Sequence, residues 1–218
     1  MIILGLTGSI GMGKTAAANS FRRLGIPVHD ADREVHGLMA QGGKAVGIIG
    51  EMFPAAVHRG IVDRQLIAAE VFTDAKALAR IEKVLHPLVR RREKKFLGRS
   101  AREGRSMVIL DVPLLFETGG EKRCDGIITV SAPLFVQRQR VLHRPGMTSK
   151  RLDSILARQM PDAEKRKRSD FVVLTGLGRD YSLLQIQKIV RLTSCWQGKH
   201  WPPRSNTAAP RQGGKSIA

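Results

Sequence analysis

Short apolar runs and segments with helical spacing alternate along the chain. The apolar runs are rich in β-branched residues, as strands buried in a parallel sheet are, and they lie at 1–7, 26–29, 107–110, 126–130 and 171–174. Segments with apolar residues three or four positions apart lie between them, the first after residue 15 and the last at 181–192. This alternation predicts an α/β fold of three layers, with helices on both faces of a central parallel sheet.

The stretch from residue 42 to 105 interrupts the alternation. It contains no convincing strand, and its spacing predicts helices at 44–52, 63–72, 75–85 and 87–97. His86-Pro87 should separate the last two, because the residue before a proline avoids the α region and proline suits the first position of a new helix. We therefore expect a helical, substrate-binding insert at 32–105 between the core segments 1–31, 106–137 and 170–194.

Two further segments differ from the core in composition. A polar helical stretch with little to bury runs from the hinge at Pro145-Gly146 to Ser169, and it favours a lid over 138–169 whose arginines close over phosphates. The alternative is that most of these cations are simply solvated. From about residue 195 the chain is rich in Pro, Gly, Ser and cations and contains no acid, which predicts a disordered basic tail at 195–218.

Residues 8–15, GSIGMGKT, match the phosphate-binding pattern G-x-x-x-x-G-K-[ST] between the first strand and the first helix. Glycines at three positions allow the backbone N–H groups to form an anion nest at a helix N-terminus. Lys14 should reach the β- and γ-phosphates of a nucleoside triphosphate, and the Thr15 hydroxyl should ligate Mg²⁺. The alternative is a glycine-rich turn with a surface lysine. The pattern predicts a P-loop NTPase-type fold whose ATP-binding residues include Gly8, Ile10, Gly11, Met12, Gly13, Lys14, Thr15 and Ala16.

Three carboxylates follow strands at the sheet edge where α/β proteins bind ligands. Asp30 and Asp32 follow the strand at 26–29, so either could orient a hydroxyl or accept its proton, and either could equally cap the next helix. Asp111 ends the run at 107–110 and resembles the carboxylate that helps to hold Mg²⁺ in a Walker B strand, a pattern of low specificity.

The excess of basic residues indicates which ligands the protein binds. With 37 Lys and Arg against 19 Asp and Glu, the net charge of +18 fits a protein that handles phosphorylated small molecules or nucleic acid. Aromatic residues make up only 5%, which is few for stacking single-stranded bases. The basic run at 90–95 reads as a mainly solvated helix face, with Arg90 the best candidate for a ligand contact.

Cysteine use and hydropathy bear on the compartment. Cys124 and Cys195 form no CxxC pair, no signal peptide precedes the first strand, and no apolar run reaches the length of a membrane span. We expect a cytoplasmic protein with no membrane partner and no specific nucleic-acid partner.

Taken together, the motifs resemble the dephospho-CoA kinase family. The resemblance covers residues 1 to about 192 and is carried, in the family's order, by TGSIGMGKT at 7–15, the DAD motif with its histidine at 30–36, GIVDRQLI at 60–67, LHPLVR at 85–90, DVPLLFE at 111–117, the cluster Gln137, Arg140 and Arg144, and RQM at 158–160. It implies ATP-dependent phosphorylation of the ribose 3′-hydroxyl of dephospho-CoA, giving CoA and ADP. The family often has Asn-x-Gly after the last strand, where this chain has Thr175-Gly176.

The resemblance also implies roles for individual residues. Asp32 would be the carboxylate that engages the 3′-hydroxyl, and Arg140 and Arg144 would serve the ATP phosphates. On the acceptor side it implies Arg64, His86, Arg90, Leu115, Phe116 and Glu117. The rival readings are another small-molecule P-loop kinase, for a nucleoside monophosphate or a sugar acid, and an NTPase that binds nucleic acid.

Overall fold

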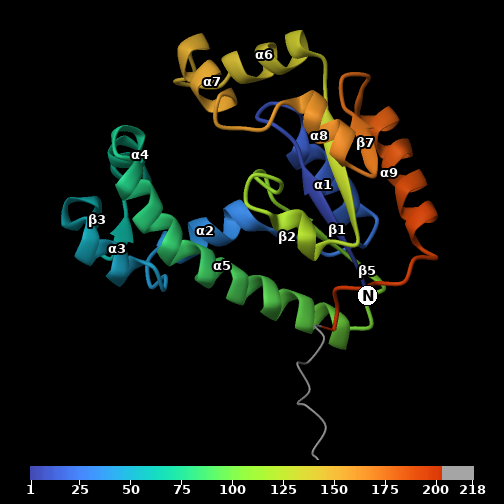
Figure 1. Cartoon of the computed structure of the whole chain (residues 1–218), viewed down its shortest axis with the longest axis horizontal. Helices are drawn as coiled ribbons and strands as arrows, with labels where there is room; N and C mark the ends of the chain where they lie inside the picture. The colour runs from blue at the N-terminus through green and yellow to red at the C-terminus, as the bar shows by residue number, and fades with distance from the viewer. Residues whose placement is uncertain (203–218) are drawn as a thin grey trace, which may run out of the picture.

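The computed structural model describes residues 1–202, apart from the side chains of residues 72, 73 and 75. Five parallel strands form one sheet in the order β2-β5-β1-β6-β7, which confirms the predicted parallel sheet (Figure 1). The strands are β1 (Ile2–Thr7), β2 (Val28–Asp30), β5 (Met107–Asp111), β6 (Gly126–Ser131) and β7 (Phe171–Leu174). Because β1 lies in the middle, the loop after it emerges at the centre of the sheet's carboxyl edge.

Alternate residues of β1 face two separate cores. Leu4 and Leu6 pack with Phe21 of α1 (Lys14–Arg23) and Ile186 of α9 (Arg179–Thr193) on one face. Ile3 packs on the other face, in a cluster with Leu97, Leu110 and Leu115. All six residues of β1 are buried, since helices or loops cover both faces, and this explains why the strand is an almost uninterrupted apolar run.

The insert forms a helical unit with its own apolar core. Its elements are α2 (Ala31–Met39), α3 (Val46–Met52), the short 3₁₀ helix η1 (Pro54–Ala56), α4 (Arg64–Thr73) and α5 (Ala75–Arg102). Leu38, Ile49, Phe53 and Ile81 lie in this core.

The prediction that the insert contains no strand is wrong. A small antiparallel hairpin pairs β3 (Val57–His58) with β4 (Ile61–Val62). Arg59 and Gly60 join the two strands with φ angles of 51° and 75°, the positive values that two-residue hairpin turns of type I′ require. The strands are only two residues long, too short for an alternating pattern to be recognised.

The predicted break at His86-Pro87 is also wrong, because α5 is one helix of 28 residues that contains Pro87. Proline removes one backbone hydrogen bond, but Pro87 and Lys83 are both exposed, so the carbonyl left without a partner can face water. Packing on both sides of the proline holds the helix together: Leu85 belongs to the core of the insert and Leu97 to the core under the sheet. Figure 1 shows α5 running from the insert back toward the N-terminus.

The predicted lid region holds α6 (Leu134–Leu142), α7 (Ser149–Leu156) and α8 (Asp162–Arg168). The expectation that it has little to bury is wrong at Leu152 and Lys165, both fully buried. Lys165 forms an ion pair of 2.9 Å with Glu117, and its carbonyl accepts a hydrogen bond from Thr129 of β6. The helix α8 is therefore part of the core packing, whereas α6 and α7 lie beyond the sheet in Figure 1.

The chain after α9 is not disordered at residues 195–202, contrary to the prediction. Trp196 packs on Phe171 with ring centroids 5.8 Å apart, Trp201 joins the core cluster around Ile3, and the Lys199 N–H donates to Asp125 at 2.6 Å. The remaining part of the predicted tail, 203–218, lies outside the described residues.

Candidate active site

The phosphate-binding pattern at residues 8–15, here called the phosphate loop, joins β1 to α1 at the centre of the sheet's carboxyl edge. Gly11 and Gly13 have φ angles of 78° and 90°, in the left-handed region that favours glycine. Space reinforces this requirement, because a Cβ on Gly11 would lie 2.5 Å from Val141 and one on Gly13 would lie 2.9 Å from Thr175. The first turn of α1 begins at Lys14, so the helix N-terminus points into the loop, as an anion site needs.

Lys14 and Asp111 form an ion pair inside the site. The Lys14 Nζ lies 2.6 Å from the Asp111 Oδ1, and the Asp111 side chain is almost fully buried. Burial raises the pKa of Asp111 to about 6; Lys14 opposes this, while the carboxylates of Asp30 and Asp32 add to it. Asp111 thus lies beside the lysine that would hold the phosphates, where a Walker B carboxylate is expected.

The two carboxylates of the DAD motif do different things. The Asp30 side chain accepts a hydrogen bond of 3.0 Å from the Arg33 N–H and caps α2, so the structure gives it the structural role that sequence left open. Asp32 lies in the first turn of α2 with an exposed side chain and lines a cavity. Asp30 lies opposite Asp111 in the register of the neighbouring strands β2 and β5. Asp32, two residues further on, therefore lies close to the ion pair of Lys14 and Asp111.

The cavity beside Asp32, which we call the acceptor cavity, has a volume of about 400 Å³. This is the size of a small-molecule site. Apolar and polar side chains share its wall: Val35, Leu85, Val89, Val112, Pro113 and Leu114 with His86, the cations Arg90 and Arg123, and the carboxylates Asp32, Glu82 and Glu93. Of the acceptor residues that the resemblance implies, Asp32, His86 and Arg90 are therefore brought together here.

Four other residues implied for the acceptor side do not line this cavity. Arg64 lies in α4, with its Nη1 3.2 Å from the His36 ring nitrogen. Leu115 is buried in the core, and Phe116 lies under the Arg168 guanidinium, 4.6 Å from the ring centroid. Glu117 pairs with Lys165 and accepts a hydrogen bond from the Met160 N–H at 2.8 Å. Burial pushes the pKa of Glu117 upward, but these hydrogen bonds outweigh it and the pKa is lowered.

Arg123 was missed by sequence reasoning. Its Nε and Nη2 donate to the two carboxylate oxygens of buried Glu93, at 3.0 and 3.1 Å, which fixes the guanidinium in the cavity wall. Its Nη1 is buried and has no hydrogen-bond partner within the described residues. The motif DVPLLFE ends six residues earlier, so no pattern pointed to this arginine.

Gln159, within the RQM motif, connects the acceptor cavity to the phosphate loop. Its side chain lines the cavity, and its Oε1 accepts a hydrogen bond of 3.1 Å from the Ile10 N–H. On the same loop residue, the Ile10 carbonyl accepts a hydrogen bond of 2.7 Å from the Gln137 side chain. Gln137, the last residue of the predicted core segment, and Gln159 of the predicted lid thus hold the middle of the loop.

Arg140 lies on α6 one turn after Gln137 and forms hydrogen bonds with Thr175. Its guanidinium donates to the Thr175 hydroxyl at 3.0 Å and carbonyl at 2.7 Å, and the same hydroxyl donates to the Met12 carbonyl at 2.6 Å. Threonine at this position therefore links the arginine to the phosphate loop. Arg144 follows α6 with an exposed side chain.

Candidate metal ligands are few. Among residues 1–202, no group of three or more His, Cys, Asp or Glu is gathered to hold a metal ion. The exposed Thr15 hydroxyl at the start of α1 and the Asp111 carboxylate are oxygen ligands of the kind that Mg²⁺ takes when most of its shell comes from phosphates and water.

Comparison with known proteins agrees with this geometry. A family model described as dephospho-CoA kinase matches residues 2–177. The chain is 59% identical over 166 residues to the dephospho-CoA kinase of Paramagnetospirillum magneticum, with 76% of this chain and 78% of that protein covered. The chain belongs to the dephospho-CoA kinase family.

Two further proteins extend the match to nearly their whole length. The dephospho-CoA kinase of Mesorhizobium japonicum is 49% identical over 190 residues, which cover 87% of this chain and 95% of that protein. The crystal structure of TT1252 from Thermus thermophilus is 38% identical with a TM-score of 0.78, over 88% of this chain and 96% of that one. Since the family is one of kinases, the chain is an enzyme of the phosphotransferase class. None of the helices within residues 1–202 is both long enough and apolar enough to span a membrane.

Proposed function

We propose that this enzyme transfers the γ-phosphoryl group of ATP to the ribose 3′-hydroxyl of dephospho-CoA, giving CoA and ADP. One observation carries the proposal beyond family membership: Gln159 lines the acceptor cavity and also binds the Ile10 N–H of the phosphate loop. The cavity and the loop therefore adjoin, as in-line transfer from a bound nucleotide to a bound alcohol requires.

The nucleotide half of the site consists of the phosphate loop with Lys14 and Arg140. The backbone N–H groups of the loop and the N-terminus of α1 would bind the β- and γ-phosphates. Lys14 would exchange part of its contact with Asp111 for the phosphates, and Arg140, held by Thr175 beside Gly11, would balance charge that develops during transfer.

Thr15 and Asp111 are the residues that would hold Mg²⁺. The ion, when bound, supplies Lewis-acid stabilisation of the charge on the phosphate oxygens. The donor set fits this role, because a hydroxyl at the start of a helix and a carboxylate leave most of the coordination shell to phosphate oxygens and water.

Asp32 is the proposed general base. It is exposed to the acceptor cavity at the end of β2 and is free of the capping role that occupies Asp30. A carboxylate in this position would orient the acceptor hydroxyl and take its proton as the bond to phosphorus forms, an effect typically of about 10²–10⁴ in rate.

The acceptor cavity has the mixture of surfaces that dephospho-CoA presents. Its apolar side chains suit the uncharged arm of the substrate, and Arg90 and Arg123 suit its diphosphate. Burial lowers the pKa of Arg90, as does the neighbouring charge of Arg123. An anion between the two guanidinium groups would relieve this repulsion and would give the buried Nη1 of Arg123 a partner.

The direct test is ADP release by the purified protein with dephospho-CoA, in parallel with adenosine monophosphate, shikimate and gluconate. We expect dephospho-CoA alone to support turnover well above the rate without acceptor, and a product phosphorylated on the 3′-hydroxyl. Faster turnover with another acceptor would overturn the assignment of substrate.

A further inference from the structure

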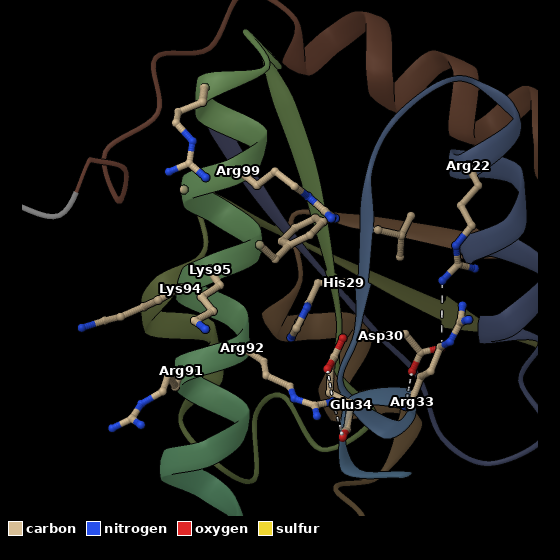
Figure 2. A pocket seen from close by; sticks show the side chains of 14 residues that line it. Arg22, His29, Asp30, Arg33, Glu34, Arg91, Arg92, Lys94, Lys95 and Arg99 are labelled. Atoms are coloured by element: carbon tan, nitrogen blue, oxygen red, sulfur yellow. Dashed lines mark hydrogen bonds and ion pairs between the residues drawn. The ribbon is translucent and has the colours of Figure 1, made fainter. Parts of the chain in front are cut away.

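A second concave surface lies beyond the wall of the active site. It is a groove of about 910 Å³ between the edge strand β2 and the second half of α5, bordered by α1 and α2 (Figure 2). We call it the basic groove. Eight cations line it, against the two carboxylates of Asp30 and Glu34: Arg22, Arg33, Arg91, Arg92, Lys94, Lys95, Arg99 and Arg102.

The cations converge from three helices and do not simply follow one solvated helix face. Arg92 and Arg99 extend from α5 toward β2 in Figure 2, while Arg22 of α1 and Arg33 of α2 lie on the opposite side. Arg91 and Lys94 point outward at the rim. A concave surface lined by charges of one sign concentrates the electric field and attracts counter-ions more strongly than a flat surface does.

The carboxylates in the groove do not neutralise this charge. Glu34 forms an ion pair with Arg92, with 2.7 Å between the carboxylate oxygen and the guanidinium nitrogen. Asp30 caps α2, and its other carboxylate oxygen lies 4.0 Å from a guanidinium nitrogen of Arg22. The remaining cations are in excess: within residues 1–202, no ion pair of Arg33, Arg91, Lys94, Lys95 or Arg102 is found.

The residues that line the groove also include a buried polar group without a partner, on His29. His29 is 3% exposed, its ring packs on Phe96, and its Nε2 has no hydrogen-bond partner among the described residues. Burial lowers the pKa of His29 even though Glu93, Glu34 and Asp30 oppose this, and Arg123 adds to the lowering. A buried nitrogen without a hydrogen-bond partner is rare in folded proteins, so His29 offers a free polar atom to a ligand bound in the groove.

The groove is distinct from the active site, although the two share walls. Asp30 faces the groove and Asp32 the acceptor cavity; on α5, Arg92 lines the groove and Glu93 the cavity. The phosphate loop lines neither the groove nor its rim.

We propose that the basic groove is a second anion site, which binds a linear oligophosphate such as the phosphate chain of a nucleotide or inorganic polyphosphate. From Arg91 to Arg102 the lining of α5 extends roughly 16 Å, more than one phosphate covers. A membrane surface fits less well, since the site is concave and none of the exposed large apolar side chains lines it. A single nucleic-acid strand also fits less well, because the one phenylalanine ring in the lining packs on His29.

The test measures tripolyphosphate binding by calorimetry in five forms of the full chain, because tripolyphosphate should also occupy the phosphate loop. Arg33→Gln/Arg99→Gln should bind one equivalent fewer than the wild type, the one in the groove, and Lys14→Ala one fewer, the one in the loop. The exposed pair on α9, Lys188→Gln/Arg191→Gln, removes the same charge elsewhere and should bind as many equivalents as the wild type. In a Lys14→Ala background, the groove substitutions should weaken binding at least tenfold, since charge-assisted hydrogen bonds are lost.

Two results would overturn the proposal. One is that Lys14→Ala binds no tripolyphosphate, and the other is that adding Arg33→Gln/Arg99→Gln to Lys14→Ala leaves tripolyphosphate binding unchanged. Groove-dependent binding of oligouridylate or phosphatidylglycerol vesicles without tripolyphosphate binding would assign the groove to another partner. Kinase turnover in Arg33→Gln/Arg99→Gln should stay within about twofold of wild type, so that loss of the second site is separable from failure of the proposed reaction. If the double variant does not melt cooperatively, Arg99→Gln alone is used, since its side chain is exposed.

Discussion

The two halves of the active site meet at Gln159, yet they are built in opposite ways. The nucleotide half is continuous in the chain: eight consecutive residues after β1 supply most of it through their backbone. The acceptor half is assembled from α2, α5, the loop after β5 and the 3₁₀ helix η2 (Gly120–Arg123), and it acts through side chains. A backbone site depends on glycines and on one strand–helix junction, whereas a side-chain site depends on packing between distant elements.

This difference predicts which kinetic parameters should change when residues of each half are substituted. Substitutions at the phosphate loop should change both turnover and ATP affinity, because in the proposed function the loop binds the group being transferred. Substitutions in the acceptor cavity should mainly change the KM for dephospho-CoA, except at Asp32, the proposed general base.

The largest effect is expected for Lys14→Ala. The substitution removes the positive charge that would contact the β- and γ-phosphates. It also leaves the buried Asp111 without its ion-pair partner. We expect kcat/KM for ATP to fall by about 10³ or more, with weaker ATP binding and a lower melting temperature. Steady-state kinetics and calorimetry with ATP check this, with Lys188→Ala as the control; near-normal ATP affinity and rate would show that the loop does not bind the phosphates as described.

Asp32→Asn should affect turnover alone. The amide keeps the shape of the side chain but cannot accept the proton, so kcat should fall by about 10²–10⁴ with the affinity for ATP unchanged. Asp30→Asn is the matched control two residues away, because asparagine also caps helices and should retain most of the activity. If the two variants lost activity equally, the division of roles between these carboxylates would be mistaken.

Arg123→Met should affect mainly the binding of the acceptor. Its free Nη1 and its fixed pairing with Glu93 predict a charge-assisted contact to the substrate's diphosphate. We expect the KM for dephospho-CoA to rise roughly 10- to 100-fold with the KM for ATP little changed. Lys122→Met removes the neighbouring, exposed charge and should have no such effect; a rise in the KM for ATP instead would place Arg123 in the nucleotide half.

The smallest effect is expected for Thr175→Val, which tests the support of the nucleotide half. The substitution keeps the shape but removes the hydroxyl that joins Arg140 to the Met12 carbonyl. Loss of one or two hydrogen bonds should raise the KM for ATP by roughly three- to tenfold and leave the KM for dephospho-CoA unchanged. Thr175→Ser, which retains the hydroxyl, should stay close to wild type. Equal kinetics of the valine and serine variants would show that the hydroxyl has no part in nucleotide binding.

Prediction from sequence succeeded where the signal was local. The five strands of the main sheet and the phosphate loop were predictable, because each depends on a few neighbouring residues with a strong preference. Prediction was less complete for side chains whose positions depend on packing between segments far apart in the sequence. Leu115, Phe116 and Glu117 belong to the same motif as Pro113, but packing turns these three toward the core, Arg168 and Lys165.

The sequence by itself determined the parallel sheet and the phosphate loop between its first strand and first helix, since glycine spacing and β-branched runs impose backbone conformations directly, and the resemblance of its motifs indicated the family. Only the tertiary structure decided that α5 continues through Pro87, that Asp30 is a cap while Asp32 faces the cavity, and that Arg123 and Gln159 join the site. These outcomes depend on which segments pack together. The conformational preference of a single residue contributes much less free energy than the burial of two apolar cores, so it does not decide them.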